Sequence, residues 1–448
     1  MDTSIAEVIR RFKREWTSLL DGETIRDICT EVGYCWRERV FDPVTTVHVF
    51  LTQLLHGNAA LSYLPHLIGR NFSAAAFCLA RARLPLSVFT TLVERIGRAL
   101  QNEGCNEQLW HGHRVLIADG TGCSMPDTPE LQEQFPQPPI QRQGCGFPVV
   151  RILALLHAGT GMILKVLTSS VSTHDITRVQ ELHPEFKAND ILVADRAFCS
   201  YTHFCLLIQR GIHAVLRMHA SQRFDFGPRG ECVRVYTHTK IRKTIRLTKL
   251  GQCDQIVSWQ KPVKAPRGQW LSQELFASLP EFLTVRQLQY AVAIPGFRSH
   301  TITLITTLLD ADRYPLTNIA ELYALRWSVE INFRHLKISM NMDVLHCTTL
   351  DGVLKEILMF CIIYNLVRLV ILEASTQQNV HPSQISFIDA LRWLATNGNL
   401  PLRLVVIPHR HPRFHPRCLK RRPKAFKFLR QPRQLLISRA LSPTYALT

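Results

Sequence analysis

Apolar residues recur at helical spacing through the N-terminal quarter of the chain, most clearly over residues 44–55 and 88–100. Pro85 interrupts the pattern at a point where a helix would end. A helix with one apolar stripe must bury it against a neighbour, so several such helices in succession indicate a common core. The pattern therefore predicts a helical N-terminal domain over residues 1–108.

Short apolar runs of strand length come next, and helical patterns separate the later ones. The expected strands are 114–119, 147–156, 162–167, 191–195 and 212–217, with helices at 176–183 and 201–210. The order strand, strand, strand, helix, strand, helix, strand predicts a mixed α/β sheet with crossover helices. We assign it to residues 109–220, as the first part of a core domain.

The pattern turns polar and strand-like over residues 221–312, which predicts a mostly β insertion within this core. Helices over residues 313–375 then complete the core. The longest apolar run, residues 357–372, is interrupted by Asn365 and Arg368. It is too short and too polar for a membrane span, so a buried helix explains it better.

Charge is unevenly distributed along the chain. There are 53 Lys and Arg against 35 Asp and Glu, a net charge of +18, and residues 391–448 contain thirteen of these cations and no acid. Three Phe are interleaved, so this helical and basic C-terminal region, residues 376–448, is predicted to bind DNA, with a solvated tail as the alternative. The DNA contacts are assigned to Lys420, Arg421, Arg422 and Lys424. The same four residues also fit a nuclear import signal.

The N-terminal sequence and the cysteine content indicate the cellular compartment. No secretory leader is visible, and thirteen cysteines without a Cys-x-x-Cys pair indicate reduced thiols. We expect a cytoplasmic, nucleoid-associated protein without a membrane partner. Arg81 and Arg83 close one helix of residues 1–108, where they can contact DNA phosphates or only complement the helix dipole.

One helix, expected over residues 323–337, carries an unusual polar face. Tyr323, Arg326, Glu330 and Lys337 stand at offsets 0, 3, 7 and 14, which places them within a stripe roughly 60° wide. Apolar residues beside this stripe would bury against a core and hold it still: Leu322, Leu325, Val329, Phe333 and Leu336. Thr317 is the expected cap of this helix. A solvated, salt-bridged surface is the alternative interpretation of the polar face.

Asp119 and Asp195 each close an apolar strand, at the edge of a sheet where α/β proteins hold ligands. If the strands are neighbours and Glu330 packs on the same sheet, three carboxylates surround one point. Such a cluster needs a cation, and oxygen ligands select Mg²⁺, for which Mn²⁺ can substitute. Two such ions can drive phosphodiester transfer, with Arg326, Lys337 and Tyr323 on phosphate oxygens. Either Asp alone could instead be a turn or capping residue.

The motifs Asp119-Gly-Thr and Asp195-Arg196-Ala-Phe, with the series Tyr323, Arg326, Glu330 and Lys337, resemble the DDE transposases of bacterial insertion sequence family four. The resemblance spans most of the chain, including the gap of 135 residues between Asp195 and Glu330. It implies an RNase H-like catalytic core that binds two Mg²⁺ through Asp119, Asp195 and Glu330. Arg196 is a further candidate for DNA contact.

The same resemblance implies the reaction and its partners. The family cuts double-stranded DNA at the inverted repeats of its element and joins the 3′ hydroxyls to target DNA, and related enzymes act as homodimers on synapsed ends. Some form a hairpinned end with the help of a Trp in the β insertion, where this chain has Trp259 and Trp270. The alternatives are a DNA-binding repressor derived from a transposase and an RNase H-like nuclease that does not join ends.

Two further candidate sites are weaker. His409, His411, His415 and Cys418 could suggest zinc, but prolines interrupt them, and a phosphate-binding tail explains them more simply. Cys123 lies near Asp119 without a His and acid arrangement, so a packed residue is expected rather than a nucleophile.

Overall fold

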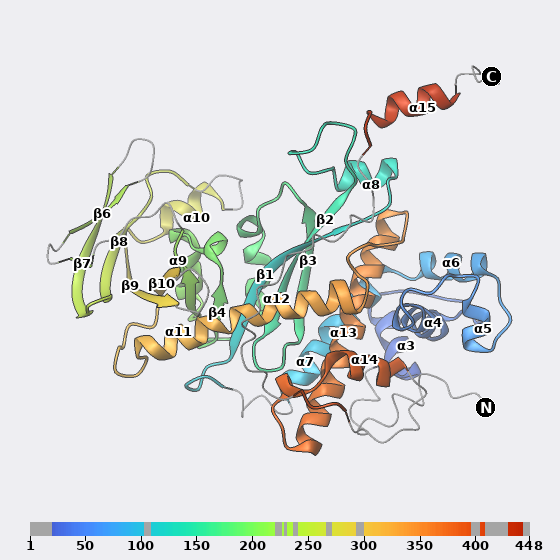
Figure 1. Cartoon of the computed structure of the whole chain (residues 1–448), viewed down its shortest axis with the longest axis horizontal. Coiled ribbons are helices and arrows are strands. Elements are labelled where there is room, and N and C mark those ends of the chain that lie inside the picture. The colour runs from blue at the N-terminus through green and yellow to red at the C-terminus, as the bar shows by residue number, and fades with distance from the viewer. Residues whose placement is uncertain are drawn as a thin grey trace, which may run out of the picture.

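The computed structural model describes residues 20–102, 109–219, 226–227, 231–235, 241–265, 271–292, 300–395, 404–407 and 429–441. It is a mixed α/β protein, as predicted, organised around a sheet of ten strands in the order β3-β2-β1-β4-β5-β10-β9-β8-β7-β6. In Figure 1 the N-terminal helices lie at one end of the molecule and strands β6–β9 lie at the other.

The described N-terminal helices are α3 (Gly22–Glu31), α4 (Pro43–Leu55), α5 (Leu64–Ile68), α6 (Ala74–Arg83) and α7 (Leu86–Asn102). Polar side chains start three of them: Asp21, Asp42 and Ser73 accept hydrogen bonds from the backbone N–H of Thr24, Thr45 and Ala76. These bonds satisfy amide groups that have no partner within the helix. Pro85 separates α6 from α7, as the sequence pattern predicts.

Five strands form the half of the sheet that carries the predicted acids: β1 (Val115–Ser124), β2 (Val149–His157), β3 (Ile163–Ser170), β4 (Ile191–Ala194) and β5 (His213–Arg217). β2 pairs antiparallel with both β1 and β3, whereas β1, β4 and β5 run parallel to one another. Helix α9 (Tyr201–Gln209) crosses from β4 to β5. The helix expected at 176–183 is instead two short 3₁₀ helices, η2 (Asp175–Thr177) and η3 (Val179–Glu185), with Pro184 inside the second.

The described part of residues 221–312 extends the same sheet. It contains β6 (Glu231–Val235), β7 (Ile241–Gly251), β8 (Asp254–Gln260), α10 (Gln273–Ser278), β9 (Phe282–Val292) and β10 (His300–Thr306). β10 pairs antiparallel with β5, so the chain returns to the first half of the sheet before the next helix begins. The division of the chain into domains stays a prediction.

The described helices after the sheet are α11 (Leu316–Ala324), α12 (Arg326–Arg334), α13 (Leu350–Gln378), α14 (Phe387–Ala395) and α15 (Arg433–Leu441). A π-helical turn, η5 (His335–Ser339), follows α12 directly. Figure 1 shows α11 and α12 running across the sheet in front of β1 and β4.

Helix α13 is the single helix, among those described, with the length and apolarity of a membrane span, yet 78% of its most apolar window is buried inside the protein. Asn365, which interrupts the apolar run, exchanges two hydrogen bonds with the backbone of Ile163. Lys355 is also buried, and its Nζ donates to the carbonyls of Arg81 and Ala82 at the end of α6. The prediction of a buried helix agrees with this packing.

The two faces of the sheet contribute to different cores. Ile117, Val193 and Val215 pack with the N-terminal helices and α13, whereas Leu116 and Leu192 pack on the face covered by α9. Successive residues of a strand point to opposite faces. Asp119 is therefore on the face of Ile117, toward α12, and Gly120 is on the other.

Candidate active site

The polar series of residues 323–337 is divided between three segments rather than one helix. Tyr323 is in α11, Arg326 and Glu330 are in α12, and Lys337 is in the π-turn η5. The break is at Leu325, which was expected in the buried stripe but is 41% exposed. Tight turns on either side of the break rotate Leu325 out of the stripe.

The predicted cap of this helix also differs. Thr317 does not cap α11, because Pro315 takes the cap position without a side-chain hydrogen bond and Thr317 is already the second helical residue. The remaining apolar residues of the stripe are buried as predicted: Leu322, Val329, Phe333 and Leu336. They fix α11, α12 and η5 on the core.

Asp119 does not end its strand, because β1 continues to Ser124 in antiparallel pairing with β2. The parallel pairing of β1 with β4 does end there, at Ala118 opposite Ala194. Asp119 and Asp195 are the next residue on each strand. Since the two strands are hydrogen-bonded neighbours, as the prediction required, the two acids emerge next to each other.

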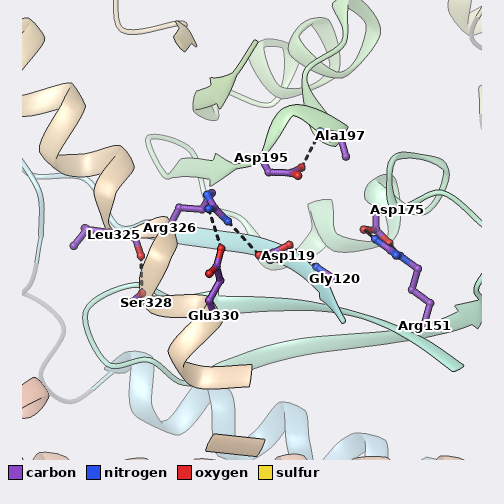
Figure 2. Close-up of polar contacts among 10 residues, drawn as sticks. All are labelled: Asp119, Gly120, Arg151, Asp175, Asp195, Ala197, Leu325, Arg326, Ser328 and Glu330. Atoms are coloured by element: carbon purple, nitrogen blue, oxygen red, sulfur yellow. Dashed lines mark hydrogen bonds and ion pairs between the residues drawn. The ribbon is translucent and has the colours of Figure 1, made fainter. Parts of the chain in front are cut away.

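Arg326 joins the acid of β1 to the acid of α12. Its Nη1 lies 3.4 Å from Oδ2 of Asp119, and its Nη2 lies 3.1 Å from Oε1 of Glu330 (Figure 2). The Arg326 side chain is only 9% exposed, while that of Glu330 is 47% exposed. The helix α12 is therefore attached to β1 through a buried cation with a carboxylate on each side.

Asp119 lies within electrostatic range of both other acids. The pKa of Asp119 is raised to about 6, chiefly by burial and also by the charges of Asp195 and Glu330, against the Gly120 N–H and Arg326, which lower it. Like charges interact in this way only over short distances. A proton or a cation at Asp119 relieves the repulsion.

The donors are of the right type for a hard divalent ion, since all three are carboxylates. Across the described residues, no three Asp, Glu, His or Cys side chains are close enough to hold an ion together. Arg326 lies between Asp119 and Glu330, and Oδ1 of Asp195 accepts a hydrogen bond of 2.8 Å from Ala197 N–H. The metal-ligand assignment of the three acids stays a prediction.

The structure gives the other predicted site residues different surroundings. The Tyr323 hydroxyl is buried and bonds to none of the described residues, and burial raises its pKa to about 12. Lys337 donates a hydrogen bond of 2.6 Å to the carbonyl of Gly122 on β1. Arg196 is exposed beside Asp195. The residues Lys420, Arg421, Arg422 and Lys424 lie outside the described residues, as do His409, His411, His415 and Cys418.

Several aromatic and sulfur side chains can also be placed. Trp259 is 1% exposed and packs edge-on against Phe204, and Trp270 lies outside the described residues. Cys123 is buried, and burial raises its pKa to about 12, which suits a packed residue. Trp327, which sequence reasoning missed, is 52% exposed with its ring 4.6 Å from the Arg326 guanidinium carbon.

A second missed feature lies behind Asp119. Arg151 of β2 forms an ion pair with Asp175 of η2 beside Gly120 (Figure 2). A single cation in the otherwise apolar run of β2 was the available sequence signal. Arg81 packs its guanidinium over the rings of Phe50 and Phe77, and its contact with DNA stays a prediction.

Known proteins resemble this chain over most of its length. Residues 110–366, which include all three acids, match the family model of the transposase DDE domain. The chain is 24% identical over 350 residues to the transposase InsG for insertion sequence element IS4 of Escherichia coli (strain K12), covering 70% of this chain and 72% of that protein. It is 20% identical over 380 residues to the transposase for insertion sequence element IS231F of Bacillus thuringiensis subsp. israelensis, covering 78% and 77%.

A solved structure is also similar. It is the cryo-EM structure of a piggyBac transposase synaptic complex with hairpin DNA, with a TM-score of 0.45 and 11% identity over 88% of this chain and 79% of that one.

Proposed function

The chain belongs to the DDE transposases of insertion sequence family four, and on that premise we propose that it cuts and joins DNA with Asp119, Asp195 and Glu330. It is a DNA transposase. The enzyme cleaves at the ends of an insertion sequence and joins the freed 3′ hydroxyls to target DNA. The observation that carries the proposal is the electrostatic coupling of Asp119 to both other acids, at the point where β1, β4 and α12 meet.

The strand order supports an RNase H-like core. The five strands β3-β2-β1-β4-β5 place the first and second acids on adjacent parallel strands, and α12 brings the third acid across the sheet. Glu330 is far away in sequence because the strands of residues 221–312 intervene. Their last strand, β10, returns the chain to β5 and thereby to the acids.

The three acids would hold Mg²⁺, or Mn²⁺ in its place. When bound, these ions supply activation of the attacking water or hydroxyl and charge stabilisation at the leaving oxygen. Arg326 orients Asp119 and Glu330 and holds α12 against β1 through its two ion pairs. Of the two acids that Arg326 links, Glu330 is more exposed than Asp119. Glu330 therefore faces the incoming DNA.

The DNA would be held by cations and an aromatic ring around the acids. Arg196 and Trp327 are exposed and can reach a phosphate and a base, respectively. We propose that three further residues contact phosphate when DNA is present: Tyr323, Arg326 and Lys337. Without DNA, Tyr323 is buried, Arg326 is paired with acids, and Lys337 is bonded to the Gly122 carbonyl. The basic residues of the tail would add contacts that do not depend on sequence.

The proposed partners are the inverted repeats of the element and a target duplex. We further propose that two copies act on paired ends as a homodimer, in the cytoplasm and on nucleoid DNA. No membrane partner is proposed, since α13 is part of the core.

The test combines the protein with Mg²⁺ and a duplex that carries the inverted repeats flanking its gene. Joined products support a transposase, cleavage alone supports an RNase H-like nuclease, and binding alone supports a repressor. Glu330→Gln is expected to abolish cleavage and leave DNA binding nearly unchanged, because the amide keeps the shape of the side chain but loses its charge. Glu321→Gln, an exposed Glu on the preceding helix, is the matched control. Undiminished cleavage by Glu330→Gln would remove Glu330 from the site.

A further inference from the structure

The ion pair between Arg151 and Asp175 is arranged so that one edge of the cation stays available. Asp175 accepts hydrogen bonds from Nε and Nη2 of Arg151. Nη1 donates to none of the described residues. The Asp175 side chain is 4% exposed, whereas that of Arg151 is 34% exposed. A guanidinium has five N–H donors in a fixed plane, so Asp175 fixes the direction of the donors that remain.

The pair sits directly on the strand that carries Asp119. A Cβ atom added to Gly120 would lie 2.6 Å from Oδ2 of Asp175 and 2.9 Å from Nη2 of Arg151. A side chain at position 120 would force the Arg151 and Asp175 side chains to shift, so Gly120 allows the ion pair to approach the backbone next to the acid. This close approach explains the glycine of the Asp119-Gly-Thr motif without reference to its dihedral angles.

Arg151 is also within electrostatic range of the acids. Its pKa is raised chiefly by the hydrogen-bonded Asp175, with further contributions from Asp119 and Asp195. Asp195 begins the turn η4 (Arg196–Phe198), and η4 packs against η2, which carries Asp175. Figure 2 shows Arg326 next to Asp119 and Arg151 on the far side of Gly120. Arg151 pairs with Gly122, so it projects from the face of β1 opposite to Asp119.

We propose that Arg151, oriented by Asp175, binds a backbone phosphate of the DNA strand that lies in the acid site. The ligand class is a phosphodiester oxygen, which suits a planar cation with free N–H groups. Asp175 is a positioning residue: it touches Arg151 and not the DNA. The inference rests on the proposed function, because it requires that DNA enters between Asp119 and Asp195.

The experiment measures the salt dependence of DNA binding. A fluorescein-labelled duplex with one terminal inverted repeat of the element is titrated with full-length protein by anisotropy at several NaCl concentrations. Ca²⁺ replaces Mg²⁺ to prevent cutting. Arg151→Gln alone would leave the buried Asp175 carboxylate unpaired, which destabilises the fold. The charge is therefore removed in the double variant Arg151→Gln/Asp175→Asn and compared with Asp175→Asn, which keeps Arg151.

One lost phosphate contact should reduce the slope of log K against log salt by about 0.9. We expect this reduction, with about tenfold weaker binding at low salt, in the double variant. Asp175→Asn should keep the slope, because Arg151 retains its charge, but should weaken binding to a smaller extent, because the guanidinium is no longer held in one orientation. Arg151→Lys/Asp175→Asn should restore the slope, because Lys keeps the charge. Arg210→Gln, an exposed cation at the opposite end of the parallel strands, should leave the slope unchanged.

The outcomes separate this inference from the proposed function. Equal slopes in wild type and the double variant overturn the role of Arg151 while the protein still binds DNA. A wild-type protein that does not bind the duplex overturns the proposed function and this inference with it.

Discussion

Asp119→Asn should make the folded protein more stable at neutral pH. Burial and neighbouring acids raise the pKa of Asp119 from 3.8 to about 6, so the folded protein binds this proton more tightly than the unfolded chain does. Between those pH values the unfolded chain releases the proton while the folded protein keeps it. Stability therefore falls as pH rises through this window.

The size of the effect follows from the two pKa values. At about 1.36 kcal/mol per pKa unit, the ionised Asp119 costs roughly 3 kcal/mol of folding free energy at pH 7. Below pH 3.8 the cost is absent. Asparagine carries no charge at any pH, so its advantage over Asp119 should be near 3 kcal/mol at pH 7 and small at pH 4.

Urea unfolding in EDTA at pH 4 and pH 7 measures this difference. Titrating groups that do not interact with Asp119 cancel when the two proteins are compared at each pH. Asp312→Asn removes an exposed acid and serves as the control, with the same difference from wild type expected at both pH values. If Asp119→Asn stabilises the protein equally at pH 4 and pH 7, the acid is not held in the environment described above.

Three further predictions use other measurements. Mg²⁺ at a hundred times its dissociation constant should raise the stability of wild type by about 2.7 kcal/mol in thermal melts at pH 7, and Glu330→Gln should lose most of this gain; an equal gain in both would exclude Glu330 as a ligand. Replacing Lys420, Arg421, Arg422 and Lys424 by Ala should lower the salt slope of DNA binding by up to roughly 3.6, and an unaltered slope would contradict their assignment. Glu356 is buried and accepts hydrogen bonds from His346 N, Cys347 N and Asn58 Nδ2. Glu356→Ala should therefore destabilise the fold by about 3–5 kcal/mol in urea melts, and Glu356→Gln by less.

Local patterns in the sequence were sufficient to predict most of the elements near the site. The apolar residues 191–194 form β4, and Asp195 follows the strand directly. The hydrophobic periodicity gave a wrong prediction where the helix geometry changes within one segment. One regular pattern over residues 323–337 predicted a continuous helix, but the turn at Leu325 and the π-turn from His335 divide it.

The sequence by itself determined the family and predicted the chemistry of the three acids, because spacing and residue type are local properties of the chain. The tertiary structure decided which groups face one another. The pairing of β1 with β4, the return of β10 to β5 and the position of Arg326 between Asp119 and Glu330 are contacts between residues far apart in sequence. The close approach of the Arg151–Asp175 ion pair to Gly120 is also a contact between residues far apart in sequence. Periodicity specifies the face on which a residue lies, whereas only packing specifies its neighbour.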